Sequence, residues 1–324
     1  MLTISAADVD AALDYAGLVG ILRAAFAAGA VQPVRHHHLV ERPDGVASTL
    51  LLMPAWSDFA SISGTGFVGV KIVSVSPDNH LAGKPAVMGI YLLMDGRTLE
   101  PLALIDGQRL TLWRTACASA LASTYLSRPE SRRLLVLGAG ALAPFLARAH
   151  AAVRPIEHIR VWNRTPANAR KLVAGLRAEG FAADVADDLD AALPHADIVT
   201  AATISTVPLV RGALLEPGTH VDLVGAFSPA MRESDEAAFM RARVYVDTRA
   251  GALKEAGDVV QAIAEGALKP EAICGELAEL ARGAVPGRGS AGEITLFKSV
   301  GAAIEDLATA TAVYEKMTAG VAGG

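Results

Sequence analysis

The chain has 324 residues, of which 52% are hydrophobic, so it can bury a substantial core in two domains or one large one. Its formal net charge is -5 and it has no run of five or more Lys or Arg, which argues against binding nucleic acid through a basic patch. Two cysteines allow at most one disulfide, so the chain does not have the composition of a disulfide-rich secreted domain.

The amino-terminal segment predicts an amphipathic helix rather than a signal peptide. It has no basic region ahead of an apolar core, and Asp8, Asp10 and Asp14 interrupt its apolar residues. Ser5 followed by Asp8 is typical of a helix N-cap with an acid in the first turn. No apolar run reaches the roughly 18 residues that cross a bilayer. We therefore expect a cytoplasmic protein with no membrane partner.

The next segment predicts an α+β domain. Apolar stretches that end at turn signals such as Asp95-Gly96 are typical of strands joined by short turns, and so of a largely antiparallel sheet. These strands are expected at residues 48–58, 67–77, 86–95 and 100–106. A helix of small residues is expected to follow at residues 110–127.

Strands alternate with helices from about residue 115. Strands are expected at residues 132–138, 158–163, 197–203, 220–225 and 242–248, and helices at 141–153 and 166–180. Apolar strands with helical crossovers indicate a parallel sheet covered on both faces, an α/β fold. A long amphipathic helix is expected at residues 299–320. The predicted domains are residues 115–300, and residues 1–114 together with 301–324.

A glycine motif between the first of these strands and its helix predicts a nucleotide site. Gly138 permits the tight turn, Gly140 lets a pyrophosphate approach the backbone, and Ala143 allows close packing of helix and strand. The alternative is an ordinary strand–helix turn in an Ala-rich chain. The cofactor is expected to contact the turn at Gly138, Ala139, Gly140, Ala141 and Leu142.

The end of the next strand predicts which nicotinamide cofactor is used. An acid normally binds the ribose of NAD at this position, but here the residues are Asn163, Arg164 and Thr165. Arg164 would attract a 2′-phosphate, to which Thr165 and Asn168 can add hydrogen bonds. The alternative is a solvated charge at a helix start. The pattern favours NADPH without excluding NADH.

Three cations are candidates for binding a small carboxylate. Lys71 lies in an apolar stretch, Arg114 lies on the Ala-rich helix, and Arg35 precedes the first expected strand. Each taken singly also fits a surface or structural role, whereas together they could clamp a carboxylate. Residues 36–38 are three consecutive histidines, which in a strand would point to alternating faces and so would not share one metal ion. No metal site is expected.

Several segments together resemble the ornithine cyclodeaminase/mu-crystallin family over about residues 30–315. They are "LLLMPAW", "GVKIVSVSPDN", "LALIDGQRLTLWRTACASALAS", "LVLGAGALA", "VWNRT", "VGAFSPAMRESD" and "GEITLFKSVGAAIEDLATA". The resemblance implies a Rossmann NADP-binding domain plus a discontinuous substrate-binding domain, which forms a homodimer through its sheet. It also implies that Lys71 and Arg114 are active-site cations that hold the substrate carboxylate, with Arg35 as a third.

The resemblance extends the predicted cofactor and substrate sites. Arg114 is also placed beside the cofactor, and Met53 is expected to shape the substrate pocket. The further residues that match cofactor-lining positions of the family are Thr203, Ile204, Val224, Ser299 and Val300.

One departure from the family pattern predicts the reaction. Cyclodeaminases carry a catalytic Asp where this chain has Phe227, and a phenyl ring cannot act as a base. The resemblance therefore implies an NAD(P)H-dependent oxidoreductase that reduces cyclic ketimines, with Δ1-pyrroline-2-carboxylate and Δ1-piperideine-2-carboxylate giving L-proline and L-pipecolate. The alternatives are an ornithine cyclodeaminase, an alanine or N-alkyl-amino-acid dehydrogenase, or a non-catalytic binding protein like the crystallin.

Overall fold

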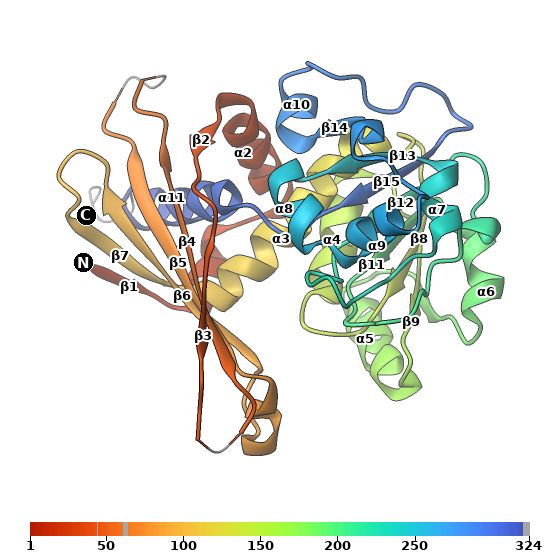
Figure 1. Ribbon diagram of the computed structural model, residues 1–324, viewed down its shortest axis with the longest axis horizontal. Helices are drawn as coiled ribbons and strands as arrows, with labels where there is room; N and C mark the ends of the chain where they lie inside the picture. Colours follow the sequence, from red (N-terminus) through yellow and green to blue (C-terminus); the bar gives the residue numbers. More distant parts are fainter. Residues whose placement is uncertain (44, 61–63, 320–324) are drawn as a thin grey trace. The chain divides into compact units, whose positions relative to one another are not determined.

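The computed structural model describes residues 1–43, 45–60 and 64–319, and the chain divides into two compact units (Figure 1). The first unit comprises Met1–Arg114 and Ala302–Gly324, and the second comprises Thr115–Gly301. This division differs from the expected one only at Gly301, which belongs to the second unit. Residues 320–324, which end the expected final helix, lie outside the described residues.

Within the described residues, the first unit contains a seven-stranded sheet in the order β1-β7-β6-β5-β4-β2, with β3 also paired to β4. Its strands are β1 (Leu2–Ile4), β2 (Ala30–Val31), β3 (His36–Val40), β4 (Ser48–Ser57), β5 (Phe67–Val75), β6 (Val87–Asp95) and β7 (Pro101–Asp106). The four expected strands are β4 to β7, and they pair antiparallel as predicted. The sequence reading missed β1, β2 and β3, because two of them are too short to show a period and β3 is exposed throughout.

The helices of the first unit cover one face of this sheet. They are α1 (Ala6–Ala12), α2 (Tyr15–Ala28), the start of α3 (Gly107–Leu126) and α11 (Ala303–Ala319), with a 3₁₀ turn η1 at Pro77–Ala82. Helix α11 packs against β4, β5, β6 and α2 (Figure 1). The expected amino-terminal helix is two helices, because Asp14 starts α2 by accepting a hydrogen bond from the Gly17 N–H at 2.7 Å. The predicted cap is present, with Ser5 and Asp8 forming a capping box.

The sequence suggested that this helix begins at residue 299, but helix α11 begins at Ala303. The Ser299 N–H donates to the Leu223 carbonyl at 3.1 Å, and Gly301 has a positive φ of 85°. These bonds and the left-handed glycine keep the segment out of a helical conformation. No single helix among the described residues is long and apolar enough to cross a membrane; α1 and α2 pass that test only as a pair bent by 86°.

The second unit contains an all-parallel sheet in the order β10-β9-β8-β11-β12-β15-β13-β14. Its strands are β8 (Arg133–Leu137), β9 (His158–Trp162), β10 (Ala183–Val185), β11 (Ile198–Ala201), β12 (His220–Leu223), β13 (Ala242–Val246), β14 (Gly275–Glu276) and β15 (Ile294–Lys298). The predicted parallel α/β fold is confirmed. The sequence reading missed β10, β14 and β15, although β15 lies in the interior of the sheet between β12 and β13.

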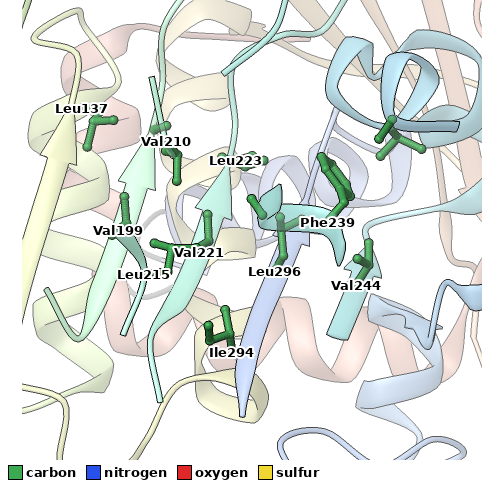
Figure 2. Close-up of a cluster of buried hydrophobic side chains, with 14 of the residues drawn as sticks. Leu137, Val199, Val210, Leu215, Val221, Leu223, Phe239, Val244, Ile294 and Leu296 are labelled. Carbon is green, nitrogen blue, oxygen red and sulfur yellow. The ribbon is translucent and has the colours of Figure 1, made fainter. Parts of the chain in front are cut away.

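Helices cover both faces of the parallel sheet. They are α4 (Ala143–Val153), α5 (Pro166–Ala178), α6 (Leu189–Ala192), α7 (Glu236–Arg241), α8 (Arg249–Glu255), α9 (Gly257–Ala264) and α10 (Leu277–Ala281), with 3₁₀ turns η2 (Leu193–His195), η3 (Gly212–Leu214) and η4 (Pro270–Ala272). Figure 2 shows one of the resulting cores, where Val199, Val221 and Leu296 from three neighbouring strands pack with Phe239 of α7. These strands are buried on both faces, yet β12 and β15 also carry buried polar side chains, among them Asp222 and Lys298.

The strand order places a ligand crevice at one position of this sheet. From β8 the chain proceeds outward to β9 and β10, and then returns to the other side of β8 with β11 and β12. In open parallel sheets, ligands bind beyond the carboxyl ends of the strands where the order reverses in this way. Residues that follow β8, β11 and β12 therefore flank the crevice of this fold.

Candidate active site and cofactor site

The turn between β8 and α4 fits a dinucleotide phosphate group. Gly138 has a positive φ of 101°, and a Cβ there would lie 2.7 Å from the Ala202 carbonyl oxygen, so this position requires glycine. A Cβ on exposed Gly140 would meet no atom within 4 Å, which leaves open space beside the turn. No side chain caps α4 at Leu142, and buried Ala143 packs its first turn closely. An uncapped helix start behind a glycine turn is suited to bind a pyrophosphate.

The turn between β9 and α5 brings the four expected ribose-side residues together. Asn163 donates from Nδ2 to the Thr165 carbonyl at 2.9 Å, which tightens the turn. Thr165 is the N-cap of α5 but its hydroxyl makes no capping bond. Arg164, Thr165 and Asn168 are exposed, and the Arg164 guanidinium makes no ion pair with any residue that the structure describes. These side chains are free to face a phosphate.

The loops after β11, β12 and β15 hold the remaining expected cofactor contacts. Thr203 and Ile204 follow β11, and the Ile204 side chain is 72% exposed. Val224 follows β12 and is largely buried. Ser299 and Val300 follow β15. Because β11, β12 and β15 are parallel neighbours, these residues lie at the same edge of the sheet as the glycine turn.

A buried network that the sequence reading missed ties these loops together. The Thr203 backbone N–H and hydroxyl donate to Glu233 Oε1 at 2.6 and 2.8 Å. The Glu233 N–H donates to Asp258 Oδ1 at 2.8 Å. Lys298 at the end of β15 donates to the Gly225 carbonyl and lies 3.1 Å from Asp258 Oδ2. The signal in the sequence was a lysine inside the apolar stretch "TLFKS".

The charge of Glu233 depends on its burial. Burial raises the pKa of Glu233 to about 8, and the Asp258 carboxylate acts in the same direction while Lys298 opposes both. The Glu233 and Lys298 side chains are fully buried, with Oε2 and Nζ 4.0 Å apart. At neutral pH the fold therefore favours a protonated Glu233, which still accepts both hydrogen bonds from Thr203.

In the first unit, Lys71 lies in the middle of the sheet and not at an edge. Strand β5 is flanked by β4 and β6, and Lys71 pairs directly with Met53 on one side and Tyr91 on the other. Directly opposed residues share a face of the sheet, so the three side chains form one row. All three are buried, on the face against which α11 packs.

Two acids on α11 neutralise the candidate substrate cations. Lys71 Nζ lies 2.8 Å from Asp306 Oδ2, and Arg114 Nε lies 3.1 Å from Asp306 Oδ1. Arg114 Nη1 pairs with Glu305 Oε2 at 2.7 Å. We call Lys71, Arg114, Glu305 and Asp306 the four-charge cluster. The sequence reading identified its cations but not its acids, although two adjacent acids in the apolar stretch "AAIEDLA" are the signal for them.

The cluster perturbs its own ionisable groups. Burial lowers the pKa of Lys71 to about 8; the Arg114 charge acts in the same direction, and the Asp306 carboxylate opposes both. Burial and Asp306 together raise the pKa of Tyr91 well above its usual value, so that its phenol stays protonated. The Tyr91 hydroxyl has no hydrogen-bond partner among the described residues. The row of three side chains thus ends in the Tyr91 hydroxyl, a hydrogen-bond donor without a partner among the described residues. It lies near Lys71 and Arg114, whose positive charges the two acids neutralise.

Two further candidates lie just outside strands. Arg35 is half-buried immediately before β3, and the three histidines that follow it are exposed on that strand. Phe227 lies in the loop after β12, 45% exposed. Across residues 1–43, 45–60 and 64–319, no group of three or more His, Cys, Asp or Glu side chains could hold a metal ion.

Comparison with known proteins identifies relatives along nearly the whole chain. The sequence profile of the ornithine cyclodeaminase/mu-crystallin family matches residues 2–321. Protein SAR DEFICIENT 4 of Arabidopsis thaliana is 43% identical over 288 residues, which are 87% of this chain and 86% of that protein. The Δ1-pyrroline-2-carboxylate reductase of Paracoccus denitrificans is 41% identical over 272 residues, 83% of this chain and 84% of that protein.

A solved structure matches the fold with similar completeness. It is the Δ1-pyrroline-2-carboxylate reductase of Thermococcus litoralis in complex with NADH and L-proline. The TM-score is 0.91 at 33% sequence identity, covering 99% of this chain and 98% of that one.

Proposed function

The chain belongs to the ornithine cyclodeaminase/mu-crystallin family, and from that premise we propose that it is an NAD(P)H-dependent reductase of cyclic ketimines. Its substrates are Δ1-pyrroline-2-carboxylate and Δ1-piperideine-2-carboxylate, which it converts to L-proline and L-pipecolate. The observation that carries the proposal is the buried pair Lys71 and Arg114 on the first unit, because two buried cations beside the apolar side chain of Met53 suit a small carboxylate attached to an apolar ring.

The residues of the chain divide the work of this reaction. NADPH or NADH, when bound, supplies the hydride that reduces the imine carbon. Arg114 holds the substrate carboxylate with its planar fork and Lys71 holds it as a point charge, which together fix the orientation of the ring. Met53 contributes the apolar wall beside Lys71. An iminium is already a good electrophile, so orientation and exclusion of water are the main tasks that remain for the protein.

The cofactor proposal rests on two turns of the second unit. The Gly138–Gly140 turn holds the pyrophosphate, and the loops after β11, β12 and β15 approach the nicotinamide half. Exposed Arg164 supports NADPH as the preferred cofactor, since a guanidinium attracts a 2′-phosphate where an acid would repel it.

A homodimer is proposed from the sheet of the first unit. One face of that sheet is covered by helices, while the opposite face carries apolar side chains that are half-buried or exposed. They are Leu52, Pro54, Val70, Ile72, Ile90, Leu92 and Leu104. A continuous apolar sheet face of this kind is typical of an interface between subunits.

The test is a coupled set of NADPH-oxidation assays with the purified protein. We expect rapid oxidation with Δ1-pyrroline-2-carboxylate and little with pyruvate plus ammonia or methylamine. Lys71→Met should lower kcat/KM by about 100-fold or more, because the substrate carboxylate loses a buried cation. The matched control is exposed Lys84→Met, which should leave kcat/KM unchanged.

Three results would change the assignment. Turnover of the acyclic pair without turnover of the cyclic imine indicates an amino-acid or N-alkyl-amino-acid dehydrogenase. Release of ammonia from ornithine indicates a cyclodeaminase, which the phenyl ring of Phe227 argues against. Binding of NADPH without any turnover indicates a binding protein.

A further inference from the structure

The four-charge cluster presents an electrostatic problem for the substrate that its cations are expected to bind. Lys71 and Arg114 contribute two positive charges, and Glu305 and Asp306 contribute two negative ones. All four side chains are at most 7% exposed. The cluster is therefore neutral before any ligand arrives, and its cations are already paired.

A carboxylate that joins this cluster brings one uncompensated negative charge. Burying an unpaired charge is strongly unfavourable, because the group loses its hydration without gaining a partner. Tyr91 faces Asp306 from β6, but its phenol is neutral and supplies only a hydrogen-bond donor. The compensating positive charge must therefore come from the ligand or from a proton taken up with it.

We propose that Glu305 and Asp306 determine the charge of the ligand, so that the site accepts a carboxylate only together with one added positive charge. A basic ligand supplies this charge as a zwitterion, with its carboxylate facing Lys71 and Arg114 and its N–H⁺ facing the acid pair, whereas a ligand without a basic nitrogen binds only when the acid pair takes up a proton. This inference rests on the proposed function and names the ionic form of the imine that is reduced. An imine that is unprotonated in solution binds with uptake of one proton, which remains on its nitrogen.

The acid pair is built to serve two cations at once. Asp306 accepts from both Lys71 and Arg114, whereas Glu305 pairs with Arg114 and accepts from the Ala302 N–H at 3.2 Å. A ligand carboxylate can take over some of the contacts that Glu305 and Asp306 make with Lys71 and Arg114. Oxygens of the two acids then become available to the N–H⁺ group of the ligand. The exchange keeps every charge paired, as low-dielectric sites require.

The test compares two ring acids of the same size by calorimetry, each bound to the protein with NADPH present. L-Proline carries a protonated nitrogen, whereas pyrrole-2-carboxylate has a nitrogen that is not basic. Titration in two buffers of different ionisation enthalpy gives the number of protons taken up. Between pH 6 and 7.5, below the pKa of Lys71 of about 8, pyrrole-2-carboxylate should bind with uptake of one proton and lose about tenfold in affinity per pH unit. L-Proline should bind with no uptake.

Glu305→Gln removes one negative charge while keeping the side-chain shape. The anion should then bind without proton uptake, and the ratio of its affinity to that of L-proline should rise at least tenfold. Exposed Glu315→Gln on the same helix is the matched control and should behave as the wild type. Asp306→Asn repeats the test if Glu305→Gln does not fold, and the wild-type proton count requires neither variant.

The inference is overturned if the wild type binds pyrrole-2-carboxylate without proton uptake, or if Glu305→Gln keeps the selectivity of Glu315→Gln. Binding of neither ring acid by the wild type would instead contradict the proposed function. The protein could also bind both ring acids as expected but fail to oxidise NADPH with the cyclic imine. That result would support the proposed role of Glu305 and Asp306 and contradict only the catalytic assignment.

Discussion

Arg164 is exposed in a turn where neighbouring groups are already arranged around it. The Asn163 amide is used to close the turn, the Thr165 hydroxyl is not used as a cap, and Asn168 lies one helical turn further on. A guanidinium that is paired with none of the described acids can turn toward a ligand phosphate without breaking an existing ion pair. We therefore propose Arg164 as the residue on which cofactor preference depends.

Arg164→Ala should raise the KM for NADPH by roughly 10- to 100-fold, because a hydrogen bond between charged groups contributes about 1.5–3 kcal/mol. The KM for NADH should change less than about twofold, since NADH has no 2′-phosphate for Arg164 to contact. Steady-state kinetics with both cofactors measure the effect, and exposed Arg170→Ala on α5 is the control. Equal losses for both cofactors would contradict the assignment.

The loops after β11, β12 and β15 behave as one unit because Glu233, Asp258 and Lys298 join them. Glu233 fixes the loop after β11 through Thr203, and Lys298 fixes the loop after β12 through Gly225. Close approach at Gly225 reinforces this, since a Cβ there would lie 2.1 Å from the Thr203 carbonyl oxygen. These contacts hold the loops in place without a ligand, which would pre-organise them for the proposed cofactor.

Glu233→Gln should change how stability depends on pH. Because the folded state raises the pKa of Glu233 from 4.5 to about 8, the folded wild type holds a proton there that the unfolded chain releases. The stability that this bound proton adds to the folded state is fully present below pH 4.5 and is lost as the pH rises through about 8. The amide cannot ionise, so the variant should show a flatter decline of the free energy of unfolding over this interval.

Denaturant melts from pH 5 to 9 measure the slope, and exposed Glu236→Gln is the control. Identical pH dependence in the two proteins would show that Glu233 does not ionise in this range.

The apolar face of the sheet in the first unit is the proposed interface between two subunits. Leu52, Ile72 and Ile90 are directly opposed across three strands, and Ile90 is 42% exposed. The opposite face of the same strands holds Lys71 and Tyr91 under α11. A subunit contact on the apolar face would therefore support the strand that carries Lys71, one of the two proposed substrate cations.

Ile90→Glu should dissociate the proposed dimer, because a carboxylate would be buried in an apolar interface without a partner. Light scattering after size-exclusion chromatography should give twice the 33.5 kDa chain mass for the wild type and the single mass for the variant. Exposed Met240→Glu on α7 is the control. A wild type that is monomeric at all concentrations would remove the interface from the proposal.

The predictions of strands and turns rested on patterns in short stretches of the sequence. Strands β4 to β8, β11 and β13 are largely apolar stretches, β9 and β12 alternate polar with apolar residues, and the Gly138 turn is contained in a few consecutive positions. Each of these depends on neighbours in the sequence. Strands of two or three residues, such as β1 and β14, were missed because they are too short to show an alternation of apolar and polar residues.

The chemistry of the first unit depends on contacts between distant positions. Lys71 was recognisable as a lysine in an apolar strand, but its partner Asp306 is 235 residues away and is brought to it only when α11 packs on β5. Likewise Glu233 in the loop before α7, Asp258 on α9 and Lys298 at the end of β15 meet although they are far apart in the sequence. Residue types and their periods can be read along the chain, whereas the pairing of buried charges is a property of packing, since it depends on which faces the folded elements bury against one another.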